Sequence, residues 1–181
     1  FVSGSYKITP WLKAMLRSGL DAYSTRKEWR NPIGAYGAWD KKGYYELQTP
    51  NGYSINTDFM LMADHKFGNF SLDGFVGGNI YFYQDNKHTS HTKNGLLVPG
   101  FYSLKSSVDP AATSSSVVKK QTNSLFAKMS VSWKSALFLD VTGRNDWSSS
   151  LPSDTRSYFY PSVAGSVVLS EFIPMPSCID F

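Results

Sequence analysis

Residues 137–169 constrain the fold more strongly than any other stretch, because apolar and polar side chains alternate there with a period of two. From 137 to 143 the odd-numbered positions carry Leu, Leu, Val and Gly, whereas the even-numbered ones include Asp140. From 158 to 169 the odd-numbered positions are again mainly apolar, and the even-numbered ones begin with Tyr158 and Tyr160. This alternation is typical of strands with one apolar and one polar face. The polar stretch between the two halves predicts a loop that joins them.

The same rhythm recurs along the rest of the chain and predicts an all-β protein. In the stretch 11–23, Leu12, Leu16 and Leu20 also fit a helical spacing, but the neighbouring strands favour a strand there as well. The connections alternate between very short turns and long polar loops, the latter predicted over residues 24–53 and 84–122, where turn-forming residues are dense. The further strands expected are 1–8, 11–23, 54–66, 70–83 and 123–133.

Two architectures fit strands with one apolar and one polar face. A soluble β-sandwich packs two such sheets together. An outer-membrane barrel turns its apolar side chains to lipid and its polar ones to the lumen, with short turns at one end and long loops at the other. The loop asymmetry over about seven strands favours the barrel, as do Trp11, Phe70 and Trp133 beside the short turns, where an aromatic girdle would lie.

Composition excludes several other classes of protein. The net charge is +4, but the 18 basic residues are scattered and indicate no nucleic-acid partner. The single Cys178 leaves neither an internal disulfide nor a thiolate metal cluster. The chain has no apolar run long enough for a transmembrane helix, and its first residues do not resemble a signal peptide. We therefore expect residues 1–181 to be an internal segment of something larger.

The amino-acid sequences of several stretches resemble those of a known family. The stretches GRNDWSS and RSYFYPS, together with YKITPWLKAMLRSGLDAY, RKEWRNPIG, NTDFMLMADHKFGNFSLDGFVGGNIYF and GLLVPGFYSL, closely resemble the SusC/RagA family of TonB-dependent outer-membrane transporters from Bacteroidetes. The resemblance covers most of the chain.

The resemblance implies a large plugged barrel of roughly 22 strands in the bacterial outer membrane. Proteins of this family import glycans or oligopeptides together with a SusD-like surface lipoprotein, are energised by TonB through the plug, and form dimers of transporter–lid pairs. Residues 1–181 would be an internal part of the barrel that lacks the plug and most strands. No cofactor is expected in this portion, and outer-membrane lipid would surround it. The runner-up is a soluble or surface-exposed β-sandwich that binds carbohydrate.

Enzymatic and metal-binding functions have little support in the sequence. It holds no nucleophile elbow and no phosphate-binding glycine loop. A glycosidase needs two carboxylates at a defined separation, and no pair among the 14 acids stands out. His88 and His91 lack supporting ligands and are expected to be solvated loop residues, so no metal site is predicted. Gly77-Gly78 inside a strand indicates close packing or a bend.

Two sets of side chains are the candidate functional residues. The charged set, which the strand pattern places on one polar face, is expected to form an ion-pair network in the lumen; it consists of Asp140, Arg144 and Asp146. The aromatic set is expected near the long loops, as a stacking surface for a sugar or peptide or else as girdle or plug packing; it consists of Tyr81, Tyr83, Trp147, Tyr158 and Tyr160.

Overall fold

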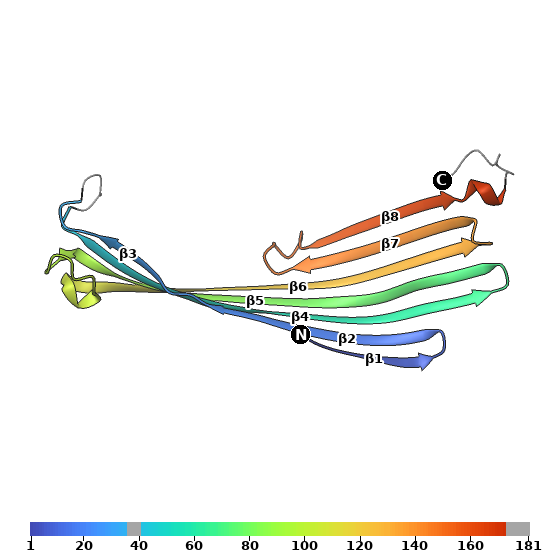
Figure 1. The fold of residues 1–181 in the computed structure, drawn as a ribbon, viewed down its shortest axis with the longest axis horizontal. Helices are drawn as coiled ribbons and strands as arrows, with labels where there is room; N and C mark the ends of the chain where they lie inside the picture. The colour runs from blue at the N-terminus through green and yellow to red at the C-terminus, as the bar shows by residue number, and fades with distance from the viewer. Residues whose placement is uncertain (36–40, 173–181) are drawn as a thin grey trace. The chain divides into compact units, whose positions relative to one another are not determined.

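The computed structural model describes residues 1–35 and 41–172, which form one antiparallel sheet of eight strands. The strand order is β1-β2-β4-β5-β6-β7-β8, with β3 paired to β4 alone (Figure 1). The strands are β1 (Val2–Thr9), β2 (Leu12–Ser24), β3 (Lys27–Asn31), β4 (Tyr44–Phe67), β5 (Phe70–Leu96), β6 (Ser107–Trp133), β7 (Leu137–Ser148) and β8 (Ser157–Val167). Two short 3-10 helices, Leu104–Ser106 and Leu169–Glu171, complete the described elements. In this part of the chain no helix is both long and apolar enough to cross a membrane.

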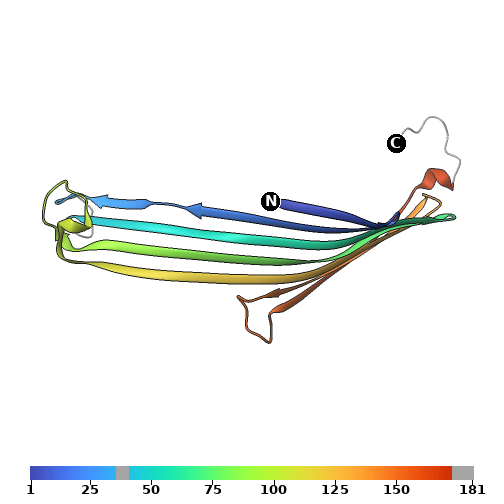
Figure 2. The same ribbon diagram turned by 90° about the horizontal axis from the view of Figure 1, so that it is seen from below.

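The chain divides into two compact units. Among the described residues, unit 1 comprises 1–20, 55–82 and 120–172. It therefore contains β1, β7, β8 and one part each of β2, β4, β5 and β6. Unit 2 comprises residues 21–54 and 83–119, with β3 and the remaining parts of those four strands. In unit 2, β4, β5 and β6 lie side by side (Figure 2).

The predicted short turns are confirmed in unit 1. Only residues 10–11 separate β1 from β2, only residues 68–69 separate β4 from β5, and only residues 134–136 separate β6 from β7. Gly68, Lys134 and Ser135 all have positive φ angles, between 51° and 61°, as tight reversals of an antiparallel pair require. Strands that follow one another in the chain and pair antiparallel through such turns form an up-and-down sheet.

The two predicted long loops are wrong over most of their length. Within 24–53 the structure has β3 and the first part of β4, and within 84–122 it has the end of β5 and the start of β6. Pro50 and Gly52 indicated a turn, but both lie inside β4. A Cβ on Gly52 would stand 2.6 Å from the carbonyl oxygen of Gln84 and 2.9 Å from the Tyr23 ring, so glycine is there to let neighbouring strands approach.

The two faces of unit 1 differ in chemistry, as the alternation predicted. Strand pairing places Val141 opposite both Met129 and Val163, while the adjacent Thr142 lies opposite Lys128 and Ser162. In the described strands of unit 1, Asp, Glu, Lys and Arg side chains lie only on the second of these faces, which we call the polar face; the other is the apolar face. Large side chains of the apolar face are exposed, among them Val2, Leu16, Leu20, Phe59, Val76, Ile80, Leu125, Met129, Phe159 and Val163.

No second sheet covers either face among the described residues. Their strands all belong to one sheet, whereas a sandwich requires two packed sheets. Buried apolar side chains in this part of the chain are only Tyr45, Leu96 and Ala136. The sandwich alternative is therefore not the fold observed.

Candidate binding surface on the polar face

The centre of the polar face in unit 1 is a hydrogen-bonded network around Asp58 on β4. Arg17 of β2 donates from Nε and Nη2 to Oδ2 of Asp58, at 2.9 and 2.6 Å. Asn79 of β5 donates from Nδ2 to Oδ1 of the same carboxylate at 2.6 Å and to Oδ1 of Asn56 at 2.6 Å. Asp58 is only 7% exposed, so these bonds replace the water that its charge has lost. The network joins three adjacent strands.

A second ion pair lies on the same face, on β7. The Nε of Arg144 is 2.8 Å from Oδ1 of Asp146, and its Nη2 donates to the hydroxyl of Ser124 on β6 at 3.0 Å. The guanidinium carbon also lies 5.6 Å from the centre of the Phe126 ring, within cation–π range. The guanidinium of Arg144 is thus held by a carboxylate, a hydroxyl and an aromatic ring.

The predicted charged set is brought together only in part. Arg144 and Asp146 pair as expected, but Asp140 lies beside Lys128 of β6, with 3.8 Å between Nζ and Oδ1, and accepts a hydrogen bond from Ser130. The network of Arg17, Asp58 and Asn79 was not predicted, although a period of two is enough to put Arg17 and Asp58 on the polar faces of their own strands. Their pairing depends on the alignment of strands that are far apart in sequence.

The predicted aromatic residues are distributed over both units. Tyr158 pairs with Asp146, and Tyr160 pairs with Arg144, which puts both tyrosines on the polar face of β8. Tyr81 belongs to the same face and borders the Asp58 network. Trp147 pairs with Asn123 and Ser157 and so lies on the opposite face.

Tyr83 belongs to unit 2, where it has its own neighbours. Tyr23 donates a hydrogen bond to Asp85. This bond, followed in size of effect by the hydrogen bond with Tyr83, raises the pKa of Tyr23 well above its ordinary value. Tyr83 therefore lies in a tyrosine–carboxylate cluster, which the sequence did not indicate.

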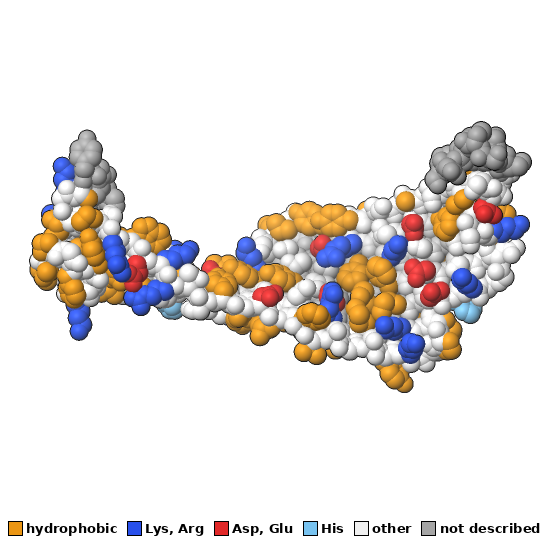
Figure 3. Space-filling model, viewed as in Figure 1, with side chains coloured by type: hydrophobic (Ala, Val, Ile, Leu, Met, Phe, Trp, Pro, Cys, Tyr) orange, Lys and Arg blue, Asp and Glu red, His pale blue; other side chains and the backbone are white. Residues whose placement is uncertain are grey.

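A hollow of about 540 Å³ opens over the middle of the polar face in unit 1. Its lining includes amide, hydroxyl, carboxylate and guanidinium groups as well as the Tyr81 and Phe126 rings. Figure 3 shows basic and acidic side chains next to one another across this part of the sheet, with apolar side chains between them. A surface with paired charges, amides and rings is suited to polar, uncharged or zwitterionic ligands.

The glycine pair in β5 makes room for large side chains on both faces. A Cβ on Gly77 would lie 2.5 Å from the Phe59 carbonyl oxygen and 2.8 Å from the Phe126 ring. A Cβ on Gly78 would lie 2.6 Å from the ring of Phe59. The prediction of close packing at Gly77-Gly78 is confirmed.

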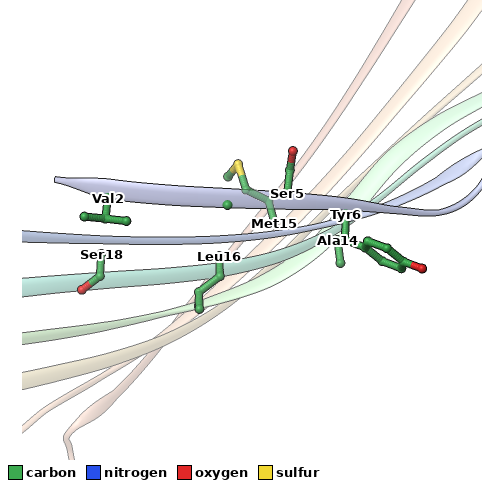
Figure 4. A pocket seen from close by; sticks show the side chains of 8 residues that line it. Val2, Ser5, Tyr6, Ala14, Met15, Leu16 and Ser18 are labelled. Atoms are coloured by element: carbon green, nitrogen blue, oxygen red, sulfur yellow. The ribbon is translucent and has the colours of Figure 1, made fainter.

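The apolar face offers no comparable polar site. Figure 4 shows its shallow depression over β1 and β2, where Val2 lies beside Ser18, Tyr6 lies beside Ala14, and Leu16 lies between these two pairs. No charged side chain lines it. This depression suits hydrocarbon rather than a polar ligand.

Aromatic side chains gather at the short-turn end of unit 1. The Trp11 and His65 rings are 6.0 Å apart, His65 and Phe67 are 5.9 Å apart, and Phe67 and Phe70 are 6.2 Å apart. Trp133, also predicted there, stacks on Phe172 and lies under the ammonium group of Lys134. The predicted position of Trp11, Phe70 and Trp133 beside the short turns is confirmed.

Unit 2 holds a compact arginine–glutamate cluster at the start of β3. Arg26 donates to Oε1 of Glu28, at 2.9 and 2.7 Å, and Arg30 donates to Oε2. The hydrogen bond from Arg30 has the largest effect on the pKa of Glu28, and that from Arg26 the next largest. Together they hold this pKa below its ordinary value. Arg30 also lies over the Tyr102 ring. Both arginines are engaged by Glu28 and so are poorly placed to bind an anionic ligand.

Nothing in the described part of the chain resembles a metal site. No group of three or more His, Cys, Asp and Glu side chains that suits a metal ion occurs in residues 1–35 and 41–172. His88 lies in β5 rather than in a loop, as does His91, whose ring is 5.9 Å from that of Tyr44. Cys178 lies outside the described residues, and so does the segment Pro174-Met175-Pro176, whose prolines predict a turn.

Comparison with known proteins identifies the fold. The chain superimposes on the structure of the RagAB peptide transporter with a TM-score of 0.82 and 17% identity, over 96% of this chain and 20% of that one. A structure of the RagAB peptide importer in a closed-closed state gives a TM-score of 0.79 at 17% identity, over 97% and 20% of the two chains. The siderophore receptor PiuA from Acinetobacter baumannii gives 0.53 at 13% identity, over 91% and 28%.

These similarities confirm the fold class: antiparallel up-and-down strands like those of barrel-type transporters. The chain spans about a fifth of the length of the RagAB chains that it matches. No protein-family profile matches the sequence, and no curated protein matches it either.

Proposed function

We propose that the chain is an internal segment of the barrel of a TonB-dependent outer-membrane importer of the SusC/RagA type. The observation that carries this proposal is one sheet with two opposite faces: an exposed apolar face without charged side chains and a polar face with hydrogen-bonded ion pairs. In water the apolar face would be strongly unfavourable, whereas in a bilayer it is the face that lipid covers. The importer is a transporter and not an enzyme.

The ends of the strands support a membrane orientation. The aromatic residues at the short turns fit the girdle at the periplasmic interface, with Trp11, Phe70 and Trp133 as members. The opposite ends of the unit 1 strands then point outward.

Oligopeptides are the substrate class that we favour. The RagAB structures are described as those of a peptide transporter. In this proposal the polar face lines the lumen, Arg144 and Asp146 belong to its ion pairs, and Tyr81, Tyr158 and Tyr160 supply a stacking surface near the outer end. Glycan import, which the sequence resemblance also implies, is the second candidate within the same transporter class.

The partners follow from the same resemblance. We propose a SusD-like surface lipoprotein as a lid, TonB acting through a plug encoded outside this segment, and a dimer of transporter–lid pairs. A protein of this kind needs no cofactor in its barrel.

The decisive experiment is to extract the native full-length protein from its membranes and identify what accompanies it. We expect it in the outer-membrane fraction, soluble only with detergent, heat-modifiable on gels and bound to a lipoprotein. Peptides released from the complex and identified by mass spectrometry would define the substrate. Recovery in the soluble fraction without detergent or a lipoprotein would contradict the importer.

A further inference from the structure

In unit 2 one edge of β6 has no neighbouring strand among the residues that the structure describes. On one side β6 pairs with β5, and on the other β7 pairs with it only from Thr122 to Trp133. None of the strands that the structure describes lies against residues 111–119 on that second side. All residues from 113 to 121 are exposed. The edge therefore presents a row of free main-chain donors and acceptors.

Contacts of Gln121 show which main-chain groups lie on this edge. Its N–H donates to the hydroxyl of Ser149 at 2.8 Å, and its carbonyl oxygen accepts from the N–H of Ser149 at 2.8 Å. Both main-chain groups of Gln121 thus point away from β5. Because this direction alternates from one residue to the next along a strand, the groups of Lys119 and Val117 point the same way.

The free edge lacks the features that usually protect such edges. Proteins block exposed edges with proline and charged residues, lysine above all. Here Pro110 stands before the edge and Lys119 ends it, while the sequence between them, AATSSSVV, contains neither proline nor charge. The side chains in this stretch are small, so a second backbone can approach closely. The unprotected stretch is long enough to pair with a strand of about eight residues, roughly 26 Å.

Charges at the two ends of the edge select a particular occupant. Asp109, which accepts a hydrogen bond from Asn94, lies before it, and Lys119 lies at its end. A short free peptide running parallel to β6 would place its amino terminus near Asp109 and its carboxylate near Lys119. An internal strand of a protein partner has no terminal charges with which to use these positions.

We propose that residues 111–119 bind an extended oligopeptide by adding it as a strand to the free edge of β6. Main-chain hydrogen bonds then supply affinity without demanding a particular sequence, as a nutrient importer requires. This inference rests on the proposed function and adds to it the place and manner of peptide capture.

The test compares two variants of the full-length transporter with its lipoprotein in detergent. Val117→Pro removes one edge N–H, whereas Val117→Thr keeps both the N–H and the side-chain shape. The probe is a tryptic digest of casein, and the peptides retained after washing are quantified by mass spectrometry. We expect Val117→Pro to bind peptides about three- to tenfold more weakly than Val117→Thr, the effect of one lost hydrogen bond.

The possible outcomes separate this inference from the proposed function. Equal binding by both variants overturns strand addition and leaves peptide import intact. If the unaltered transporter retains no peptide, peptide import itself fails, and the inference fails with it. If Val117→Pro releases the lipoprotein while peptide binding is unchanged, the edge holds the lipoprotein and the inference is wrong.

A second measurement does not depend on any substitution. Hydrogen exchange of the unaltered complex should slow in residues 111–119 when casein peptides are added, but not in residues 2–9 of β1, which have no place in the proposed binding surfaces. Exchange at 111–119 that is already slow without peptide, and unchanged by it, would mean that another part of the protein covers the edge.

Discussion

Arg17 and Asp58 are 41 residues apart in sequence, yet the guanidinium of Arg17 donates two hydrogen bonds to one carboxylate oxygen of Asp58. Through Asn79, the same carboxylate is also bonded to β5. The side chain of Arg17 is half exposed and that of Asp58 almost buried, so the acid depends on the base more than the reverse.

Removing the guanidinium should therefore destabilise the full-length barrel. We expect Arg17→Met to lower the free energy of unfolding by about 1–3 kcal/mol, because a mostly buried carboxylate loses its charged partner. The measurement is urea unfolding in detergent followed by heat-modifiable gel mobility. Arg26→Met, which removes an exposed arginine of unit 2, should cost less than about 1 kcal/mol. Equal effects would show that Asp58 does not need Arg17.

A charge on the apolar face should be much more harmful than one on the polar face. Val163, 69% exposed, and its neighbour Ser162 lie on opposite faces of β8. We expect Val163→Arg to reduce stability in lipid vesicles by about 2–4 kcal/mol if it lies near the bilayer centre, and Ser162→Arg to have little effect. Reversed effects of these two substitutions would assign the faces the other way round.

Gly77 should tolerate no side chain, whereas Gly4 should accept one. A Cβ at Gly77 would collide with the Phe59 carbonyl oxygen, but one at Gly4 meets nothing within 4 Å. We expect Gly77→Ala to lower unfolding stability by about 1–3 kcal/mol through overpacking. Gly4→Ala should be neutral or slightly stabilising in the same assay. A neutral Gly77→Ala would imply that β5 shifts easily.

If the tyrosines of the polar face contact substrate, their rings should matter more than their hydroxyls. We expect Tyr160→Ala and Tyr81→Ala each to weaken peptide retention about two- to tenfold, the energy of one aromatic contact, while Tyr160→Phe retains binding. Tyr6→Ala, on the apolar face, is the control. Unchanged retention in both alanine variants would leave only a structural role for the two rings.

The arginine–glutamate cluster should make β3 sensitive to acid. Because the pKa of Glu28 is lowered in the folded chain, its contribution is complete above the ordinary glutamate pKa and is lost as pH falls through the lowered value. Hydrogen exchange of residues 27–31, corrected for intrinsic pH dependence, should accelerate only in that acidic range. Glu28→Gln should abolish this pH dependence, and its persistence would assign the effect to another group.

The sequence predicted what depends on neighbouring residues and missed what depends on strand alignment. Alternation at Val141 and Thr142 identified the two faces, and the close spacing of successive alternating stretches identified the short turns. The extent of β4 was missed because Pro50 and Gly52 indicate a turn locally, whereas the approach of Gln84 and Tyr23 decides their conformation.

In the candidate site, too, the sequence predicts the face on which a side chain lies but not the residue with which it pairs. That Asp140 and Arg144 share the polar face could be predicted from a period of two. That Asp140 pairs with Lys128 rather than Arg144 could not, because the partner depends on the alignment of β6 with β7.

Among the residues that the structure describes, only Tyr45, Leu96 and Ala136 are buried apolar side chains. Folding an ordinary domain is driven by hiding apolar surface inside the molecule, and unit 1 has almost no inside. If the chain belongs to the proposed outer-membrane importer, its driving force comes from the change of solvent, when water leaves the apolar face and hydrocarbon replaces it. The strands would then pair as the chain enters the membrane. A chain still in water would stay unfolded, and chaperones would have to keep it from aggregating.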